Sequence, residues 1–159
     1  MRSVARLLVV VVAVLVCLGA KRQGTTESGL RFVADDAIKA RVDGFGAAEK
    51  QELERVYGES LSVVALEVTN RSEDGFEWYP FYPTKACYRG AKVFTPADVN
   101  SALWRSELEG KTRDLFRGGT VAAGGSRTFL VAFPGDMDWT QVVRLELYKF
   151  GGQLIQELR

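Results

Sequence analysis

Residues 60–70, SLSVVALEVTN, decide the fold class of this chain, because they form a short apolar segment that is rich in β-branched residues. Such a segment is typical of a β-strand that is apolar on both faces. The turn-forming residues 70–75, NRSEDG, end the pattern. We therefore predict a strand whose two faces carry Leu61, Val63, Ala65 and Glu67 on one side, and Val64, Leu66 and Val68 on the other.

Similar short segments fill most of the remaining chain and are separated by glycine-containing turns. Residues 37–45 alternate as a half-buried strand would, and the Gly151–Gly152 pair fits a two-residue hairpin turn. Pro80 and Pro83 make the segment that precedes the first hairpin an edge strand or an irregular crossing. About seven or eight short strands with such turns predict a mainly β fold, a two-sheet β-sandwich. The further expected strands are 76–82, 86–88, 92–94, 126–134, 142–150 and 153–158.

One inserted helix is predicted at 96–109. Thr95 can act as its N-cap, Pro96 suits the first helical position, and Asp98 favours the positive end of the helix dipole. Gly110 can end it in the left-handed conformation. Residues 47–57 also have helical composition and predict a short helix.

The chain resembles the bacterial immunoglobulin-like (telokin-like) extracytoplasmic domains over roughly residues 36–150. The segment VVALEVTNRS (63–72) is similar to their "V-x-V-x-V-x-N-x-S" strand, and VAAGGS (121–126) with FLVAFP (129–134) is similar to the approach to a late strand. The resemblance implies an immunoglobulin-like two-sheet sandwich that serves as a binding or structural module without a catalytic residue. The small sandwich lipoproteins of bacterial secretion machines show a second, fainter similarity.

The N-terminus has the layout of an export signal. Arg2 and Arg6 precede an apolar run of 14 residues, 7–20. A helix of that length covers roughly 21 Å, which is shorter than the roughly 30 Å hydrocarbon core, so a signal peptide is favoured over a membrane span. An uncleaved anchor helix and lipidation at Cys17 are the alternatives. The expected organisation is a signal peptide or anchor at 1–20, a linker at 21–35, and the sandwich domain at 36–159. We expect this domain to be periplasmic, tethered to the outer face of a membrane, or secreted.

Composition excludes several classes of function. The chain has no histidine, which removes Ser-His-Asp and Cys-His catalysis and every His-ligated metal site. Its 21 basic and 20 acidic residues leave no basic surplus for nucleic acid. Asp136 and Asp138 supply too few oxygens for a calcium loop. After the leader only Cys87 remains, and we expect it to be buried. We therefore expect no enzyme activity, no cofactor and no metal.

The aromatic segment around residues 76–82 is the candidate contact surface. Trp and Tyr at a sheet edge make good anchors for a protein or a glycan, although the same residues can simply cover the edge of the sandwich. The predicted partner is another envelope or extracellular protein, or a glycan, with the membrane as a further partner through an uncleaved or lipidated N-terminus. A carrier with an apolar cavity between the sheets and a carboxylate-dependent hydrolase remain as alternatives. The predicted contact residues are Trp78, Tyr79, Phe81 and Tyr82, with Trp104 on the helix beside them.

Overall fold

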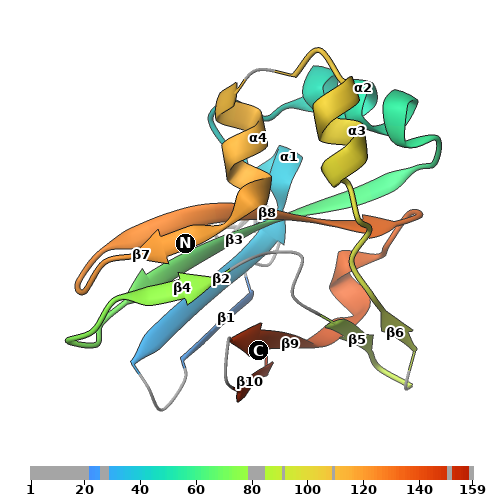
Figure 1. Ribbon diagram of the computed structural model, residues 1–159. Helices are drawn as coiled ribbons and strands as arrows, with labels where there is room; N and C mark the ends of the chain where they lie inside the picture. The colour runs from blue at the N-terminus through green and yellow to red at the C-terminus, as the bar shows by residue number, and fades with distance from the viewer. Residues whose placement is uncertain are drawn as a thin grey trace, which may run out of the picture.

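The computed structural model describes residues 22–25, 29–78, 85–90, 92–108, 110–149 and 152–157, and these residues form a mainly β fold with several antiparallel sheets (Figure 1). A first sheet has the strand order β1-β2-β3-β8, a second sheet has the order β10-β9-β5-β6, and β4 pairs with β7. The strands are β1 (Arg22–Thr25), β2 (Leu30–Asp36), β3 (Leu61–Asn70), β4 (Phe76–Trp78), β5 (Lys85–Tyr88), β6 (Val93–Phe94), β7 (Gly119–Val121), β8 (Ser126–Pro134), β9 (Val142–Lys149) and β10 (Gly152–Glu157). The helices are α1 (Ala37–Ala40), α2 (Ala47–Tyr57), α3 (Asn100–Arg105) and α4 (Gly110–Arg117), with a 3₁₀ turn at Trp139–Gln141.

The central strand β3 is covered on both faces, as its sequence pattern requires. Its alternating side chains enter two separate hydrophobic clusters, one on each side of the first sheet. The inner cluster joins the first sheet to the second. Its largest fully buried members are Trp78, Phe32, Phe129, Phe133, Leu66 and Leu147.

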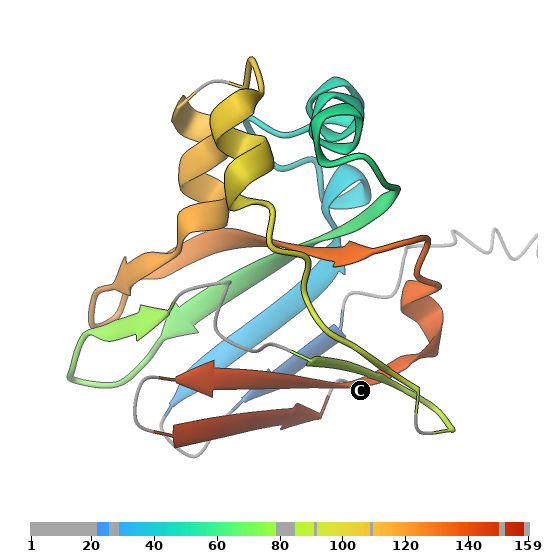
Figure 2. The ribbon, with the colours of Figure 1, turned by 45° about the vertical axis from the view of Figure 1, so that its right-hand side comes forward.

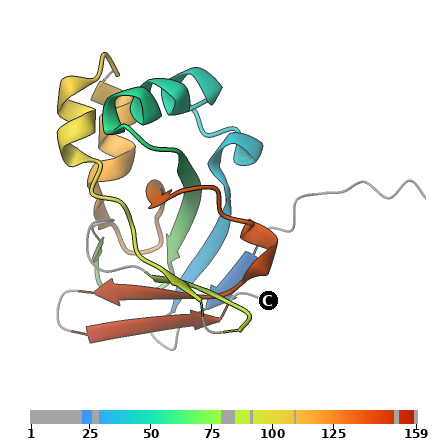
Figure 3. The same ribbon diagram turned by 90° about the vertical axis from the view of Figure 1, so that its right-hand side faces the viewer.

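The outer cluster joins the first sheet to the helices. Figure 2 shows three layers: the helices, the first sheet, and the second sheet on the far side. The quarter-turn view in Figure 3 agrees that all four helices lie on one side of the first sheet. Members of this cluster include Leu53, Leu61, Leu103, Phe116 and Leu130.

The space between the two sheets is filled by side chains. A void of about 10 Å³ lies there, lined by Val64, Leu66, Val131 and Phe133 of the first sheet and by Leu145 and Leu147 of the second. Such a void is about the size of a single water molecule. The inter-sheet cavity that a lipid or small-ligand carrier would use is therefore not present between these residues.

The predicted strand at 37–45 is wrong, because residues 37–40 form α1. The carboxylate of Asp36 accepts hydrogen bonds from the amides of Ile38 (3.0 Å) and Lys39 (3.1 Å), which starts a helical turn. Arg41 then adopts a left-handed conformation (φ 53°) and ends the turn. A local cap thus overrides the alternation of apolar residues.

Two strands, β1 and β2, lie in the segment that composition marks as a linker, 21–35. They pair with each other, and β2 pairs along its whole length with β3. Phe32 and Ala34 of β2 are fully buried in the core, so this segment belongs to the sheet.

The predicted helix at 96–109 is shorter in the structure and begins later. The amide of Ala97 donates to the carbonyl of Ala132 (2.9 Å), which holds the chain extended beside β8. Asp98, rather than Thr95, accepts a hydrogen bond from the first helical amide, that of Asn100 (3.1 Å). The helix α3 ends at Arg105, and the second helix α4 was not predicted.

Other predictions are confirmed. The helix at 47–57, the long strand at 61–70 and the strand at 126–134 have the expected positions. Antiparallel hairpins form at β5–β6 and β9–β10. The leader at 1–20 lies outside the described residues, and within those residues no helix is long and apolar enough to cross a membrane.

Candidate functional site

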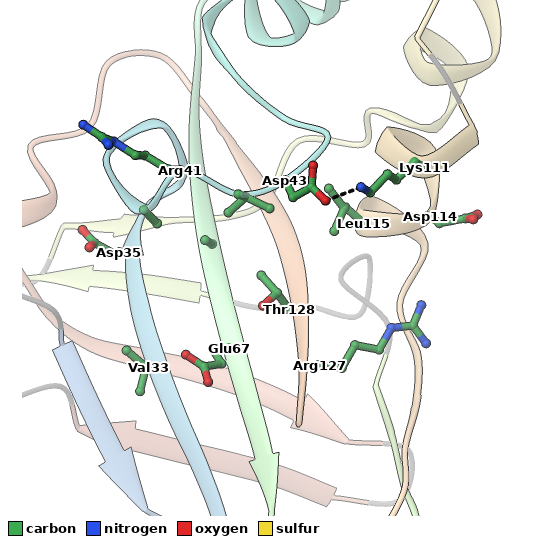
Figure 4. Close-up of a pocket in the computed structure, with 13 residues that line it drawn as sticks. Val33, Asp35, Arg41, Asp43, Glu67, Lys111, Asp114, Leu115, Arg127 and Thr128 are labelled. Atoms are coloured by element: carbon green, nitrogen blue, oxygen red, sulfur yellow. Dashed lines mark hydrogen bonds and ion pairs between the residues drawn. The ribbon is translucent and has the colours of Figure 1, made fainter. Parts of the chain in front are cut away.

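A groove of about 550 Å³ lies on the outer face of the first sheet, between α1 with its following loop and α4 (Figure 4). The residues of the sheet that line it come from β2, β3 and β8. It is lined by Val33, Asp35, Ala40, Arg41, Val42, Asp43, Ala65, Glu67, Lys111, Asp114, Leu115, Arg127 and Thr128. The groove combines apolar side chains with charges of both signs, as small-ligand sites commonly do.

Three contacts hold the two walls of the groove together. The ammonium of Lys111 on α4 pairs with the carboxylate of Asp43, and the hydroxyl of Thr112 donates to the carbonyl of Gly44 (2.5 Å). Beneath them the rings of Phe45 and Phe116 pack edge to face, with centroids 5.6 Å apart. The loop at 41–46 and α4 are therefore fixed to each other, and the groove is preformed.

The Lys111 ammonium holds the pKa of the Asp43 carboxyl below its usual range. Because folding lowers this pKa, the ion pair stabilises the fold above the usual aspartate range, and this contribution is lost as the pH falls through the lowered pKa. We predict that Lys111→Met raises the pKa of Asp43 back towards its usual value, measured by NMR titration of the carboxyl carbon. Lys50→Met is the matched control, because Lys50 pairs with Glu54, and an Asp43 pKa that is unchanged by Lys111→Met contradicts the assignment.

The floor of the groove carries two carboxylates. Asp35 is 8% exposed, and its Oδ1 accepts the amide of Asp36 at 2.9 Å. Glu67 stands on the central strand β3, between Val33 of β2 and Thr128 of β8. Alternation in the sequence already places Glu67 on the face of Leu61, Val63 and Ala65, where a charge is out of pattern. The charge of Glu67 on this apolar face could have indicated the groove, which was not predicted from the sequence.

Trp104 forms a second surface feature, on α3. Its side chain is 66% exposed, and the guanidinium groups of Arg113 and Arg117 lie 5.7 and 5.0 Å from its ring centroid. Both arginines come from α4, one helical turn apart. We call these three residues the Trp104 patch. Both guanidinium groups lie close to the ring, which remains open to solvent.

Trp78 is in the core and not on an accessible edge, which corrects the predicted contact surface. It is 1% exposed and packs against Phe129, with ring centroids 4.9 Å apart at 70°. It lies on the inner side of the first sheet, whereas Trp104 lies on the helical side, so the structure does not bring them together. Tyr79, Phe81 and Tyr82, like Cys17, lie outside the described residues.

Cys87 is buried, as expected, at 5% exposure. Its sulfur lies 3.7 Å from a guanidinium nitrogen of Arg144, which also pairs with Glu146 at 2.8 Å. Hydrogen bonding to Glu146, and then the neighbouring thiol, raise the pKa of Arg144. The thiol on β5 is therefore flanked by the Arg144 and Glu146 side chains of β9.

Comparisons with known proteins give no relative for this chain: no family model, no curated protein and no solved structure matches it.

Proposed function

We propose that this chain is an exported, non-catalytic binding module with an immunoglobulin-like sandwich, which contacts another envelope or extracellular protein through the Trp104 patch. The N-terminal signal or anchor would place it in the periplasm, on the outer face of a membrane or outside the cell. The intact mass of protein recovered from membranes distinguishes a cleaved leader, a retained anchor and lipid on Cys17.

The order of the strands supports the immunoglobulin-like assignment. In that fold one sheet contains strands A, B, E and D in this order, and the other contains G, F and C, with C′ beside C in some members. The order β2, β3, β8 corresponds to A, B and E, and the order β10, β9, β5, β6 corresponds to G, F, C and C′. Among the described residues, β1 is an additional strand beside β2, and no strand pairs with β8 in the position of D. The helices are insertions, α1 and α2 between β2 and β3, and α3 and α4 between β6 and β8.

The observation that carries the binding proposal is the exposure of Trp104. Tryptophan is highly buried on average, and tryptophan and arginine are among the residues most enriched at the energetic centres of protein interfaces. The Trp104 patch supplies one tryptophan and two arginines on adjacent helices. The ring also lies close to both guanidinium groups before a partner arrives, and such preorganisation lowers the entropy cost of binding.

A pull-down from envelope fractions tests this proposal. The tagged wild-type domain should retain a defined partner, and Trp104→Ala should weaken that interaction by roughly 30-fold, as expected for a residue at the centre of an interface. Val93→Ala is the matched control, since Val93 is 49% exposed on the second sheet. Retention of the partner by Trp104→Ala at the level of Val93→Ala would overturn the proposal, provided both variants melt near the wild-type temperature.

A further inference from the structure

The Trp104 patch carries positive charge that its described neighbours leave unpaired. Arg113 and Arg117 of α4 lie 5.7 and 5.0 Å from the Trp104 ring centroid, and Arg105 follows the tryptophan on α3, exposed to solvent. Among the residues that the structure describes, neither Arg105 nor Arg113 makes an ion pair. Three guanidinium groups therefore accompany one exposed aromatic ring.

The described chain uses few of the hydrogen-bond donors of these arginines. One terminal nitrogen of Arg113 donates to the carbonyl of Ser106 (3.2 Å), and its Nε is buried without a partner among the described residues. Within the same part of the chain, Arg105 donates from its Nε to the carbonyl of Ser101 (3.2 Å). Because a guanidinium has five N–H donors, the terminal nitrogens of both groups can still bind an anion.

The described acidic residues of this region act on other groups. Asp114 lines the groove, and its carboxylate lies 3.5 Å from Arg117, whose side chain remains 48% exposed. The amide of Glu107 donates to the carboxylate of Glu52 on α2 (3.2 Å). The pKa of Arg55 on α2 is raised first by its hydrogen bond with Glu52 and also by the charge of Glu107, so Glu107 acts towards α2. The patch is therefore a cationic surface on the helical layer, where α3 and α4 lie side by side (Figure 2).

The two arginines of α4 set a spacing for the anions that they bind. Arg113 and Arg117 are four residues apart on one helix, which is about 6 Å along its axis. In an extended segment, residues i and i+2 project from the same side and lie about 6.6 Å apart. Two acidic residues separated by one residue therefore match the two arginines, and an apolar side chain beside them can cover the Trp104 ring.

We infer that the Trp104 patch binds an extended acidic segment of the partner protein, in which two carboxylates separated by one residue pair with Arg113 and Arg117 and a neighbouring apolar side chain packs on Trp104. Arginine suits this role because its planar guanidinium can bind both oxygens of a carboxylate. The inference rests on the proposed function and names the chemistry of its partner. A surface of anionic lipid offers negative charge without this spacing and is the rival that the experiment addresses.

Fluorescence polarisation of dye-labelled peptides, titrated with the full chain in a mild non-ionic detergent, tests the inference. The probe is an acetylated peptide with the core Glu-Leu-Glu, and the controls have the cores Gln-Leu-Gln and Glu-Glu-Leu. The probe should bind about tenfold more tightly than the Gln-Leu-Gln peptide, the expected effect of charge-assisted hydrogen bonds. Its affinity should fall between about 0.1 M and about 1 M salt, because the Debye length shortens from about 10 Å to about 3 Å.

Two variants localise the contact. Arg117→Gln removes the charge of an exposed side chain and should weaken binding of the acidic probe about tenfold. Arg117→Glu should abolish this binding, since like charges then face each other. Arg71→Gln is the matched control and should bind as wild type, because Arg71 is exposed at the turn after β3 and makes no side-chain ion pair with the described residues.

Equal affinities of Arg117→Gln and Arg71→Gln would overturn the inference, as would equal binding of the acidic and the amide peptides. Equal binding of the Glu-Glu-Leu peptide would overturn the assigned spacing. Phosphatidylglycerol vesicles provide the lipid arm: if they bind wild type more tightly than Arg117→Glu while the acidic peptide does not bind, the patch recognises lipid and the inference is wrong. A partner whose retention depends on Trp104 but not on Arg117 contradicts only the acidic chemistry and leaves the proposed protein contact in place.

Discussion

Trp78→Ala should lower the free energy of unfolding by about 3–5 kcal/mol, the cost of removing a large aromatic side chain from a packed core. Trp78 is 1% exposed and packs against Phe129 between the two sheets. Natural domains are stable by only about 5–15 kcal/mol, so the variant should be close to unfolding at 37 °C. Urea denaturation followed by tryptophan fluorescence and circular dichroism measures the change.

Trp104→Ala is the matched control for Trp78→Ala, because it makes the same chemical change at a site that is 66% exposed. It should cost about 1 kcal/mol or less, since the side chain is mostly exposed and its contacts with Arg113 and Arg117 are weak at such a site. If Trp78→Ala were as stable as Trp104→Ala, the Trp78 ring would not be a core side chain, and the aromatic contact surface predicted from sequence would regain its support.

The strands could be predicted from sequence because their signal is local. In β9 apolar and polar side chains alternate with a period of two, β3 and β8 are short apolar runs, and glycine turns separate the strands. The pattern of β3 also shows apolar residues on both faces. What it does not show is which layer covers each face, because that depends on residues far away in the chain.

The helices were harder to predict because short-range hydrogen bonds and tertiary contacts decide them. The alternation of Ile38, Ala40 and Val42 looks like a strand, yet the cap made by Asp36 turns the chain into α1. At the other helix, the bond from Ala97 to Ala132 pulls residues away from the predicted start. In α4 few residues are apolar, and only Thr112 and Phe116 are buried, so no apolar stripe stands out.

The candidate sites were also hard to predict, because contacts between distant parts of the chain form them. The groove brings together segments near residues 35, 67, 111 and 127, and such an assembly has no spacing in the sequence that could reveal it. Trp78 and Trp104 were predicted as one surface because both are aromatic and close to an expected edge. The first sheet separates them, and only burial in the folded structure distinguishes the core tryptophan from the exposed one.

Asn70→Ala should be the second most damaging of these substitutions, with a loss of about 3 kcal/mol. Asn70 is fully buried at the end of β3, and its side-chain amide donates to the carbonyls of Asp74 (2.7 Å) and Val121 (3.1 Å). Its side-chain oxygen accepts from the amide (3.0 Å) and the hydroxyl (2.5 Å) of Ser72. Removing the side chain leaves buried polar groups without partners, at about 1–3 kcal/mol for each fully buried group.

Because of the hydrogen bond to Val121, Asn70→Ala should affect strands other than β3. Val121 belongs to β7, which pairs with β4, so Asn70 ties this two-stranded ribbon to the central strand of the first sheet. Hydrogen exchange should therefore quicken in β4 and β7 before it quickens in β3 and β8, and chemical denaturation should give the total loss. Ser72→Ala is the control, since it removes only the hydroxyl bonds and should cost about 1 kcal/mol or less. If Asn70→Ala cost no more than Ser72→Ala, with exchange in β4 and β7 unchanged, the ribbon would be held by the packing of Phe76 and Trp78 rather than by this buried amide.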